Sequence, residues 1–166
     1  MNHFELFNIP PTLQPDQDLV RQKFYALSRQ FHPDFHSRAS EDEQLRALEQ
    51  ASQLNMAYKV FQSPDETIKY LLKMKGLLEE EEKYQLAPEF LMEMLDLNDQ
   101  ALEATTPEER TRLQNDIAHI KLEIYEPVEA IIKNYQEGVT SEEELLQVKE
   151  YYYRKKYLDR ILAGVS

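Results

Sequence analysis

Apolar residues recur at helical spacing along almost the whole chain, and no stretch shows the alternation with a period of two that a half-buried strand requires. The first long apolar stripe follows Asp16, a residue suited to cap a helix. Its members, at steps of four, three and four, are Val20, Phe24, Leu27 and Phe31. A second stripe follows Ser40, which forms a capping box with Glu43. Its members are Leu45, Leu48, Ala51, Leu54, Tyr58 and Phe61.

These two stripes predict two long antiparallel helices joined by a loop at about residues 32–40. An apolar turn at residues 3–7, ended by Pro10-Pro11, is placed to cover this helical hairpin. Ser63-Pro64 restarts the chain as a helix, and Gly76 ends it. Residues 76–86 contain four consecutive glutamates, which disfavour packing, so we expect a linker there. A frayed helix end is the alternative, and the two are compatible.

The second half of the chain predicts a three-helix bundle. Its first helix covers about residues 88–103, with apolar positions at Phe90, Leu91, Met94, Leu95 and Leu102. Thr106 and Glu109 form a capping box for the second helix, which we expect to continue, kinked at Pro127, as far as Gly138. Its stripe comprises Leu113, Ile117, Ile120, Ile124, Ile131 and Tyr135. Ser141 and Glu144 cap the last helix, whose stripe comprises Leu145, Val148, Tyr152, Leu158 and Leu162.

The charge of the chain also changes at about residue 75. Residues 1–75 carry nine Lys or Arg and ten Asp or Glu, whereas residues 76–166 carry ten and 21. The formal net charge of −12 argues against nucleic acid as the main partner, because phosphate needs a concentrated positive surface. No stretch approaches the roughly 18 apolar residues that span a membrane, so no membrane partner is expected. The chain shows no secretory signal and no cysteine, so we expect a cytoplasmic protein.

The tripeptide His32-Pro33-Asp34 stands at the turn between the two long helices. Pro33 lacks a backbone donor and pushes the preceding residue out of the helical region, so His32 should end a helix and Asp34 should project from a stiff corner. His32, Asp34 and His36 could instead chelate a metal. Pro33 breaks the register that pairs residues four apart, and no fourth ligand is evident, which disfavours the metal site.

The run Phe31-His32-Pro33-Asp34 between two helices resembles the signature of the J-domain, found in DnaJ-type co-chaperones. Leu54–Phe61 resembles that domain's third-helix pattern. The starting run Asn2–Phe7, the segment from Ser63 to Leu72 and especially Phe90–Leu97 are similar to the HscB family, the J-type co-chaperones of iron–sulfur cluster assembly, in its bacterial form. The resemblance implies an all-α, L-shaped protein with a J-domain at 1–75, a linker at 76–86 and a scaffold-binding bundle at 87–166.

The resemblance also implies a non-enzymatic adaptor without a cofactor. The J-domain would stimulate ATP hydrolysis by the DnaK-type chaperone HscA, and the bundle would deliver the cluster scaffold IscU. Residues matching the chaperone-binding positions are His32, Pro33, Asp34, Arg21, Lys23 and Arg29. Residues matching the scaffold-binding positions are Leu91, Met92, Leu95, Asp96, Asp99, Glu103 and Tyr157. Many J-domains carry lysine after the tripeptide, where this chain has Phe35-His36.

Several alternatives stay open. Leu91, Met92 and Leu95 could be core residues. Tyr151–Tyr153 followed by Arg154–Lys156 could form a nucleic-acid surface, although an ordinary helix with a solvated basic face fits the surrounding acidity better. The rival functions are an adaptor for a general DnaK-type chaperone and a small metal-dependent hydrolase. Weak self-association is a further open alternative.

Overall fold

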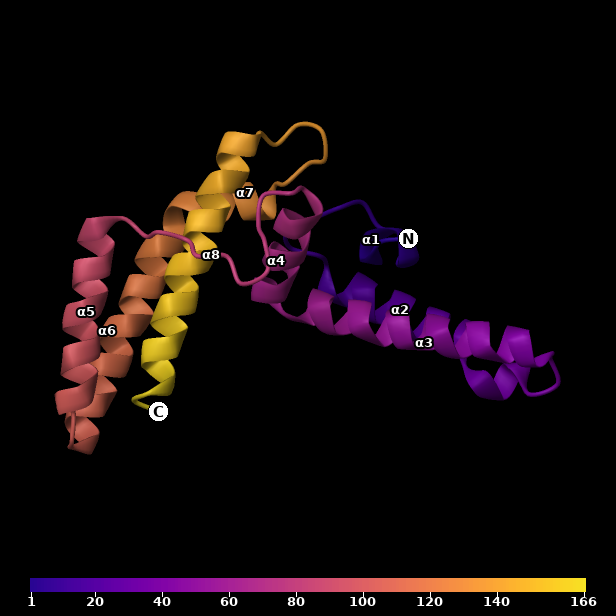
Figure 1. The fold of residues 1–166 in the computed structure, drawn as a ribbon, viewed down its shortest axis with the longest axis horizontal. Coiled ribbons are helices and arrows are strands. Elements are labelled where there is room, and N and C mark those ends of the chain that lie inside the picture. The colour runs from indigo at the N-terminus through magenta and orange to yellow at the C-terminus, as the bar shows by residue number, and fades with distance from the viewer. The chain divides into compact units, whose positions relative to one another are not determined.

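The computed structural model describes the backbone of residues 1–166 and every side chain except that of Pro33 (Figure 1). The described residues form helices and contain no strand, which confirms the all-α prediction. They divide into two compact units, one of Met1–Leu71 with Tyr135–Val139 and the other of Leu72–Asn134 with Thr140–Ser166. Among the described residues, no helix has the length and apolar character needed to cross a membrane.

The first unit is built on an antiparallel pair of long helices (Figure 1). Its elements are α1 (His3–Leu6), α2 (Gln17–Phe31), the 3₁₀ helix η1 (Pro33–His36), α3 (Glu41–Gln62) and most of α4 (Pro64–Met74). The Asp16 carboxylate accepts from the amides of Asp18 and Leu19 as predicted, and the Ser40 hydroxyl accepts from the amide of Glu43 at 3.3 Å, which is one half of the predicted capping box. Local signals therefore suffice to start both helices.

The α1 turn covers the hairpin as expected. The Phe4 and Phe7 rings lie 5.2 and 5.1 Å from the Phe61 ring of α3, centroid to centroid. These aromatic rings belong to one apolar core. Its buried members in this unit are Phe4, Phe7, Leu13, Val20, Ala47, Leu54, Ala57, Phe61, Ile68 and Leu71.

The predicted stripe of α3 is wrong near the loop. Leu45 and Leu48 are 59% and 56% exposed, and Ala47 occupies the buried position of this turn instead. Leu48 follows Ala47 by one residue, about 100° around the helix, and Leu45 precedes it by two, so neither shares its face. The small Ala47 side chain is therefore the one buried in this turn, and both leucines are exposed.

A pH-dependent contact joins α1 to α4. The His3 ring stacks on the Tyr70 ring at 4.3 Å, and the His3 amide donates to the Tyr70 hydroxyl at 2.9 Å. Partial burial lowers the pKa of the His3 imidazole below its ordinary value of 6.5. The folded state therefore binds this proton less tightly than the unfolded state does.

We expect the stability that depends on neutral His3 to be complete above the unfolded pKa and to be lost as the pH falls below it. A His3→Phe variant keeps an aromatic ring against Tyr70 and cannot titrate. Its free energy of unfolding, measured with denaturant between about pH 7.5 and about pH 5.5, should fall less than that of the wild type. An equal loss in both proteins would contradict the assignment.

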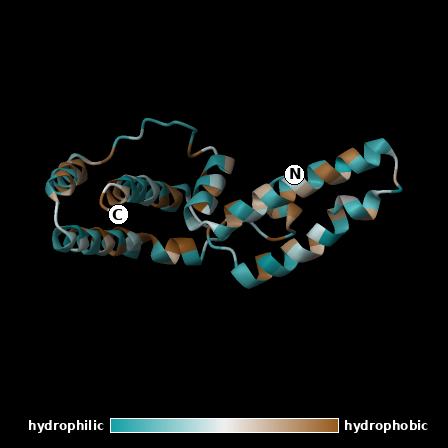
Figure 2. Ribbon diagram, turned by 90° about the horizontal axis from the view of Figure 1, so that it is seen from below, coloured by the Kyte–Doolittle hydropathy of each residue, from teal (hydrophilic) through white to brown (hydrophobic). Residues whose placement is uncertain are grey.

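The second unit contains the predicted three-helix bundle, formed by α5 (Pro88–Glu103), α6 (Pro107–Tyr125) and α8 (Glu142–Ala163). The Thr106 hydroxyl accepts from the Glu109 amide at 3.2 Å, and Ser141 and Glu144 form a complete capping box. Figure 2 shows that the helices of the chain carry both hydrophilic and hydrophobic residues. The bundle core consists of Phe90, Met94, Leu97, Leu113, Ile117, Leu158, Ile161 and Val165.

Pro127 breaks its helix rather than kinking it, so the prediction of a continuous helix is wrong. The 3₁₀ turn η2 (Glu126–Val128) separates α6 from the short α7 (Glu129–Lys133). Proline has no N–H to bond to the preceding turn, and its ring clashes with the carbonyl four residues back. The turn shifts the stripe, so that Ile132 is buried instead of Ile131, and Gly138 (φ +80°) lies in the turn beyond α7.

The acidic segment after α4 is fastened to α8. Gly76 (φ +73°) ends α4 as predicted, with Leu77 donating to the Leu72 carbonyl at 2.9 Å. The expectation that the glutamate run stays unpacked is wrong at Glu82. Its carboxylate accepts from Lys149 at 2.7 Å and from the Tyr153 hydroxyl at 3.2 Å, and the Lys149 bond lowers the pKa of Glu82. The Tyr84 ring stacks on that of Tyr153, with 4.5 Å between centroids.

Candidate functional site

The corner between α2 and α3 has the backbone that its proline predicts. His32 is extended (φ −63°, ψ 132°) and ends α2, and η1 follows at once. The amide of Asp34 donates to Nδ1 of His32 at 3.2 Å, so the histidine caps η1. The side chain of Pro33 lies outside what the structure describes.

Two further side chains hold this corner in place. Nε2 of His36 donates to the Gln30 carbonyl at 3.0 Å, which satisfies one of the free carbonyls at the end of α2. From the opposite helix, Nε2 of Gln44 donates to the carbonyls of Ser37 and Ala39 at 3.0 and 3.2 Å. Both long helices therefore fix the loop, and His36 acts as a fastening residue in this sequence.

The Asp34 carboxylate projects from this fixed backbone with its side chain 88% exposed. Its Oδ2 atom lies 3.5 Å from Nδ1 of His32, a distance compatible with an ion pair if the histidine is protonated at Nδ1. An amide N–H can only donate, however, so the Nδ1 atom that accepts from Asp34 carries no proton. We therefore take the carboxylate as unpaired by His32 and available to a partner.

The basic residues predicted to steer the chaperone differ in their surroundings. Nζ of Lys23 donates to the Asn8 carbonyl at 2.7 Å, which holds a residue of positive φ (52°) in the preceding loop. Arg21 lies 3.5 Å from Asp18 on the solvent side, and Arg29 is exposed in the last turn of α2. Arg21 and Arg29 thus remain candidates for electrostatic steering, whereas Lys23 also has a structural contact.

An apolar surface runs along α5. Leu91, Met92 and Leu95 are 38%, 68% and 52% exposed, so the alternative that they are core residues is wrong. Leu102, 77% exposed and eleven residues after Leu91, continues the same side of the helix. We call Leu91, Met92, Leu95 and Leu102 the α5 apolar face. Leu102 is missing from the predicted set, although its spacing from Leu91 and Leu95 was the signal that could have found it.

Acidic and aromatic side chains accompany the α5 apolar face. Asp96, Asp99 and Glu103 are exposed on the same helix. Tyr157 comes from α8, where it is half-buried and packs against the bundle core, with the Arg160 guanidinium 5.5 Å from its ring centroid. An exposed apolar patch with an acidic border is typical of a protein-binding surface.

The structure gives less support to the two rival sites, a nucleic-acid surface and a metal site. Tyr151 and Tyr152 are buried, so they offer no rings for stacking nucleic-acid bases. At the loop, one ring nitrogen of His36 is engaged by Gln30. Within the part of the chain that the structure describes, no group of three or more His, Asp or Glu side chains is placed to hold a metal ion.

Comparison with known sequences finds relatives that match part of this chain. Residues 86–166 match the family model described as the HSCB C-terminal oligomerisation domain. The chain is 41% identical over 101 residues to the co-chaperone protein HscB homolog of Vibrio vulnificus, and 40% identical over 107 residues to that of Vibrio cholerae. These matches cover 60% and 64% of this chain but only 59% and 62% of the relatives, so the chain spans less than two thirds of their length.

The matches to solved structures cover more of this chain than the sequence matches do. The chaperone HscB from Vibrio cholerae superposes with a TM-score of 0.73 at 27% identity, covering 99% of this chain and 95% of the other. The crystal structure of human co-chaperone protein HscB has a TM-score of 0.83 at 22% identity, covering 99% of this chain and 80% of that one. The human structure bears on the fold alone.

Proposed function

We propose that this chain is a co-chaperone of the HscB family and an adaptor in iron–sulfur cluster assembly. In this proposal, residues 1–75 act as a J-domain that stimulates ATP hydrolysis by the DnaK-type chaperone HscA. Residues 87–166 bind the scaffold protein IscU and deliver it to the chaperone. The adaptor itself catalyses no reaction and works in the cytoplasm.

The corner at His32-Pro33-Asp34 supports the chaperone half of the proposal. The backbone around Asp34 is fastened by His32, His36 and Gln44, so little conformational entropy is lost when a partner binds it. A charge-assisted hydrogen bond from an exposed carboxylate to an arginine contributes about 1.5–3 kcal/mol. Such a bond adds to the contacts of Arg21 and Arg29, which raise the rate of encounter with an acidic surface.

The α5 apolar face supports the scaffold half. Burial of its exposed side chains against a partner would remove apolar surface from water, the main favourable contribution at protein interfaces. Asp96, Asp99 and Glu103 at its border would set the orientation of a partner with complementary charge. Tyr157, half-buried against the core, is an aromatic anchor whose position is already restricted.

The observation that carries the proposal is that one chain presents both a fixed, exposed carboxylate corner and an exposed apolar helix face. Titration of the purified protein into HscA should raise its steady-state ATPase rate, and adding IscU should raise it further. Stimulation without any response to IscU would favour the adaptor for a general DnaK-type chaperone. Absence of stimulation under both conditions would refute the proposal.

A further inference from the structure

A long groove separates α5 from α6 in the bundle. It consists of three adjoining hollows of about 430, 410 and 280 Å³. Glu93, Ile120 and Glu123 line both the first and the second, and Gln100 and Asp116 line both the second and the third. Neighbouring hollows share lining residues, and we call the three together the α5–α6 groove.

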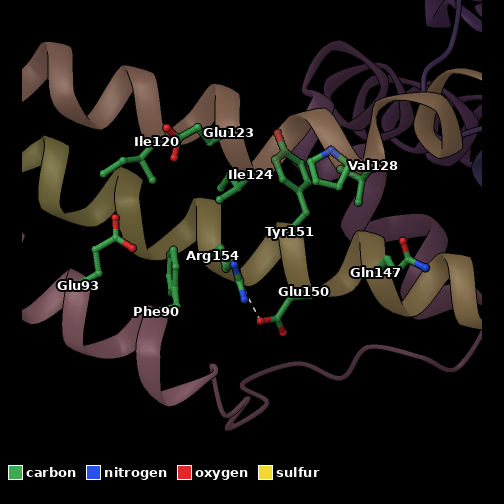
Figure 3. Close-up of a pocket in the computed structure, with 11 residues that line it drawn as sticks. Phe90, Glu93, Ile120, Glu123, Ile124, Val128, Gln147, Glu150, Tyr151 and Arg154 are labelled. Atoms are coloured by element: carbon green, nitrogen blue, oxygen red, sulfur yellow. Dashed lines mark hydrogen bonds and ion pairs between the residues drawn. The ribbon is translucent and has the colours of Figure 1, made fainter.

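Apolar residues form part of the wall at one end of the α5–α6 groove (Figure 3). Phe90 of α5, Ile124 of α6 and Tyr151 of α8 line it, together with Val128 of η2. Arg154 also lines this end, but its guanidinium lies 4.6 Å from the Phe90 ring centroid and its Nε donates to Glu150 at 2.9 Å. The charges of Arg154 and Glu150 therefore offset one another, and this end of the groove offers an apolar wall beside the carboxylates of Glu93 and Glu123.

The rest of the groove is acidic. Its walls carry six carboxylates: Glu93, Asp96, Glu103, Glu109, Asp116 and Glu123. Arg112 and His119 are the basic residues along the same walls, and Nε2 of His119 lies 2.8 Å from the carboxylate of Glu123. Glu93 and Asp116 have no ion-pair partner among the residues that the structure describes. The negative charge of the groove is thus largely uncompensated within the bundle.

The groove and the α5 apolar face lie on different sides of α5. Glu93 is two residues from both Leu91 and Leu95, which places it about 200° away around the helix. Asp96 and Glu103 lie between the two surfaces and belong to both. The groove is therefore distinct from the α5 apolar face, although it shares Asp96 and Glu103 with the surface proposed to bind the scaffold.

We propose that the α5–α6 groove binds a basic segment of a partner protein. An apolar side chain of this segment fills the hollow formed by Phe90, Ile124 and Val128. Lysine or arginine residues beyond it lie along Glu93 and Asp116. The combination of an apolar anchor with a line of carboxylates is complementary to such a segment and repels an acidic one. This inference does not depend on the proposed co-chaperone function.

The test uses a fluorescent peptide of about twelve residues with two leucines followed by lysines, long enough to follow the groove. Fluorescence anisotropy with the full chain should show saturable binding that weakens as salt rises. The double variant Glu93→Gln with Asp116→Asn should bind the peptide about tenfold more weakly, since it loses two charge contacts. The matched control, Glu142→Gln with Glu143→Gln on the exposed start of α8, should bind as the wild type does.

Two further binding measurements test whether the peptide occupies the groove through its leucines. A Leu91→Ala variant, altered on the α5 apolar face, should bind the peptide normally, and its loss of peptide binding would overturn the separate groove. A peptide with serines in place of both leucines should bind clearly more weakly, and equal binding would reduce the interaction to general charge attraction. Equal weakening by the groove variant and the α8 control would overturn the proposal in the same way. Thermal unfolding of each variant shows whether the fold is kept.

Discussion

An Asp34→Asn variant should lose most of the stimulation of HscA ATP hydrolysis while keeping the wild-type fold. Asparagine preserves the backbone amide that donates to His32, so the corner and η1 should persist. The side chain of Asp34 is 88% exposed, so the substitution leaves the core packing unchanged. The change removes the negative charge, and with it a contact of about 1.5–3 kcal/mol, which corresponds to roughly ten- to 150-fold in affinity at 25 °C.

The measurement is the ATPase rate of HscA over a titration of each protein. Asp42→Asn is the matched control, because Asp42 is an exposed carboxylate in the first turn of α3 and stands outside the tripeptide. Circular dichroism and thermal unfolding check that both variants fold. Normal stimulation by Asp34→Asn would show that the corner carboxylate plays no part, and the J-domain assignment would fail with it.

Replacing Leu91, Met92 and Tyr157 together with alanine should abolish tight binding of IscU. Well-placed apolar and aromatic side chains at an interface cost about 1 kcal/mol or more each when truncated, so the triple variant should bind about 100-fold more weakly or worse. The first two are exposed, so their truncation opens no cavity. Tyr157 packs partly against the core, and a small loss of stability is expected from that substitution alone.

Isothermal titration of IscU into the wild type and the triple variant measures this effect. Leu122→Ala is the matched control, because Leu122 is 69% exposed on α6 and lies outside the predicted scaffold-binding set. The triple variant should still stimulate HscA in the absence of IscU, since the J-domain corner is unchanged. Undiminished IscU binding would place the scaffold on another surface of the bundle.

Local chemistry allowed the helices and the corner to be predicted from the sequence. Asp16, Ser40, Thr106 and Ser141 cap the helices that were expected to follow them, because a side chain and an amide two or three residues later suffice for a cap. His32 ends α2 because Pro33 constrains the residue before it. Interactions over a few residues do not depend on the remainder of the fold.

The break at Pro127 shows where such local reasoning ends. Pro127 predicts an interruption of its helix. The amino-acid sequence around it does not distinguish a kink from the 3₁₀ turn that separates α6 from α7. The packing of Val128 and Ile132 into the second unit decided this, since the turn changes which residues face inward. Likewise, four adjacent glutamates disfavour packing, whereas Lys149 and Tyr153, distant in sequence, hold Glu82 against α8.

Periodicity, capping residues and composition suffice to predict the all-α class, the helix starts, the stiff carboxylate corner and the uneven charge. They do not predict which part of each wide apolar stripe is buried, because that depends on the packing of the helices. On α5 this packing buries Phe90, Met94 and Leu97 and leaves Leu91, Leu95 and Leu102 exposed. The physical reason is that a helix stripe specifies a range of directions, while burial depends on where the neighbouring helices lie. The α5 apolar face and the α5–α6 groove both follow from that arrangement.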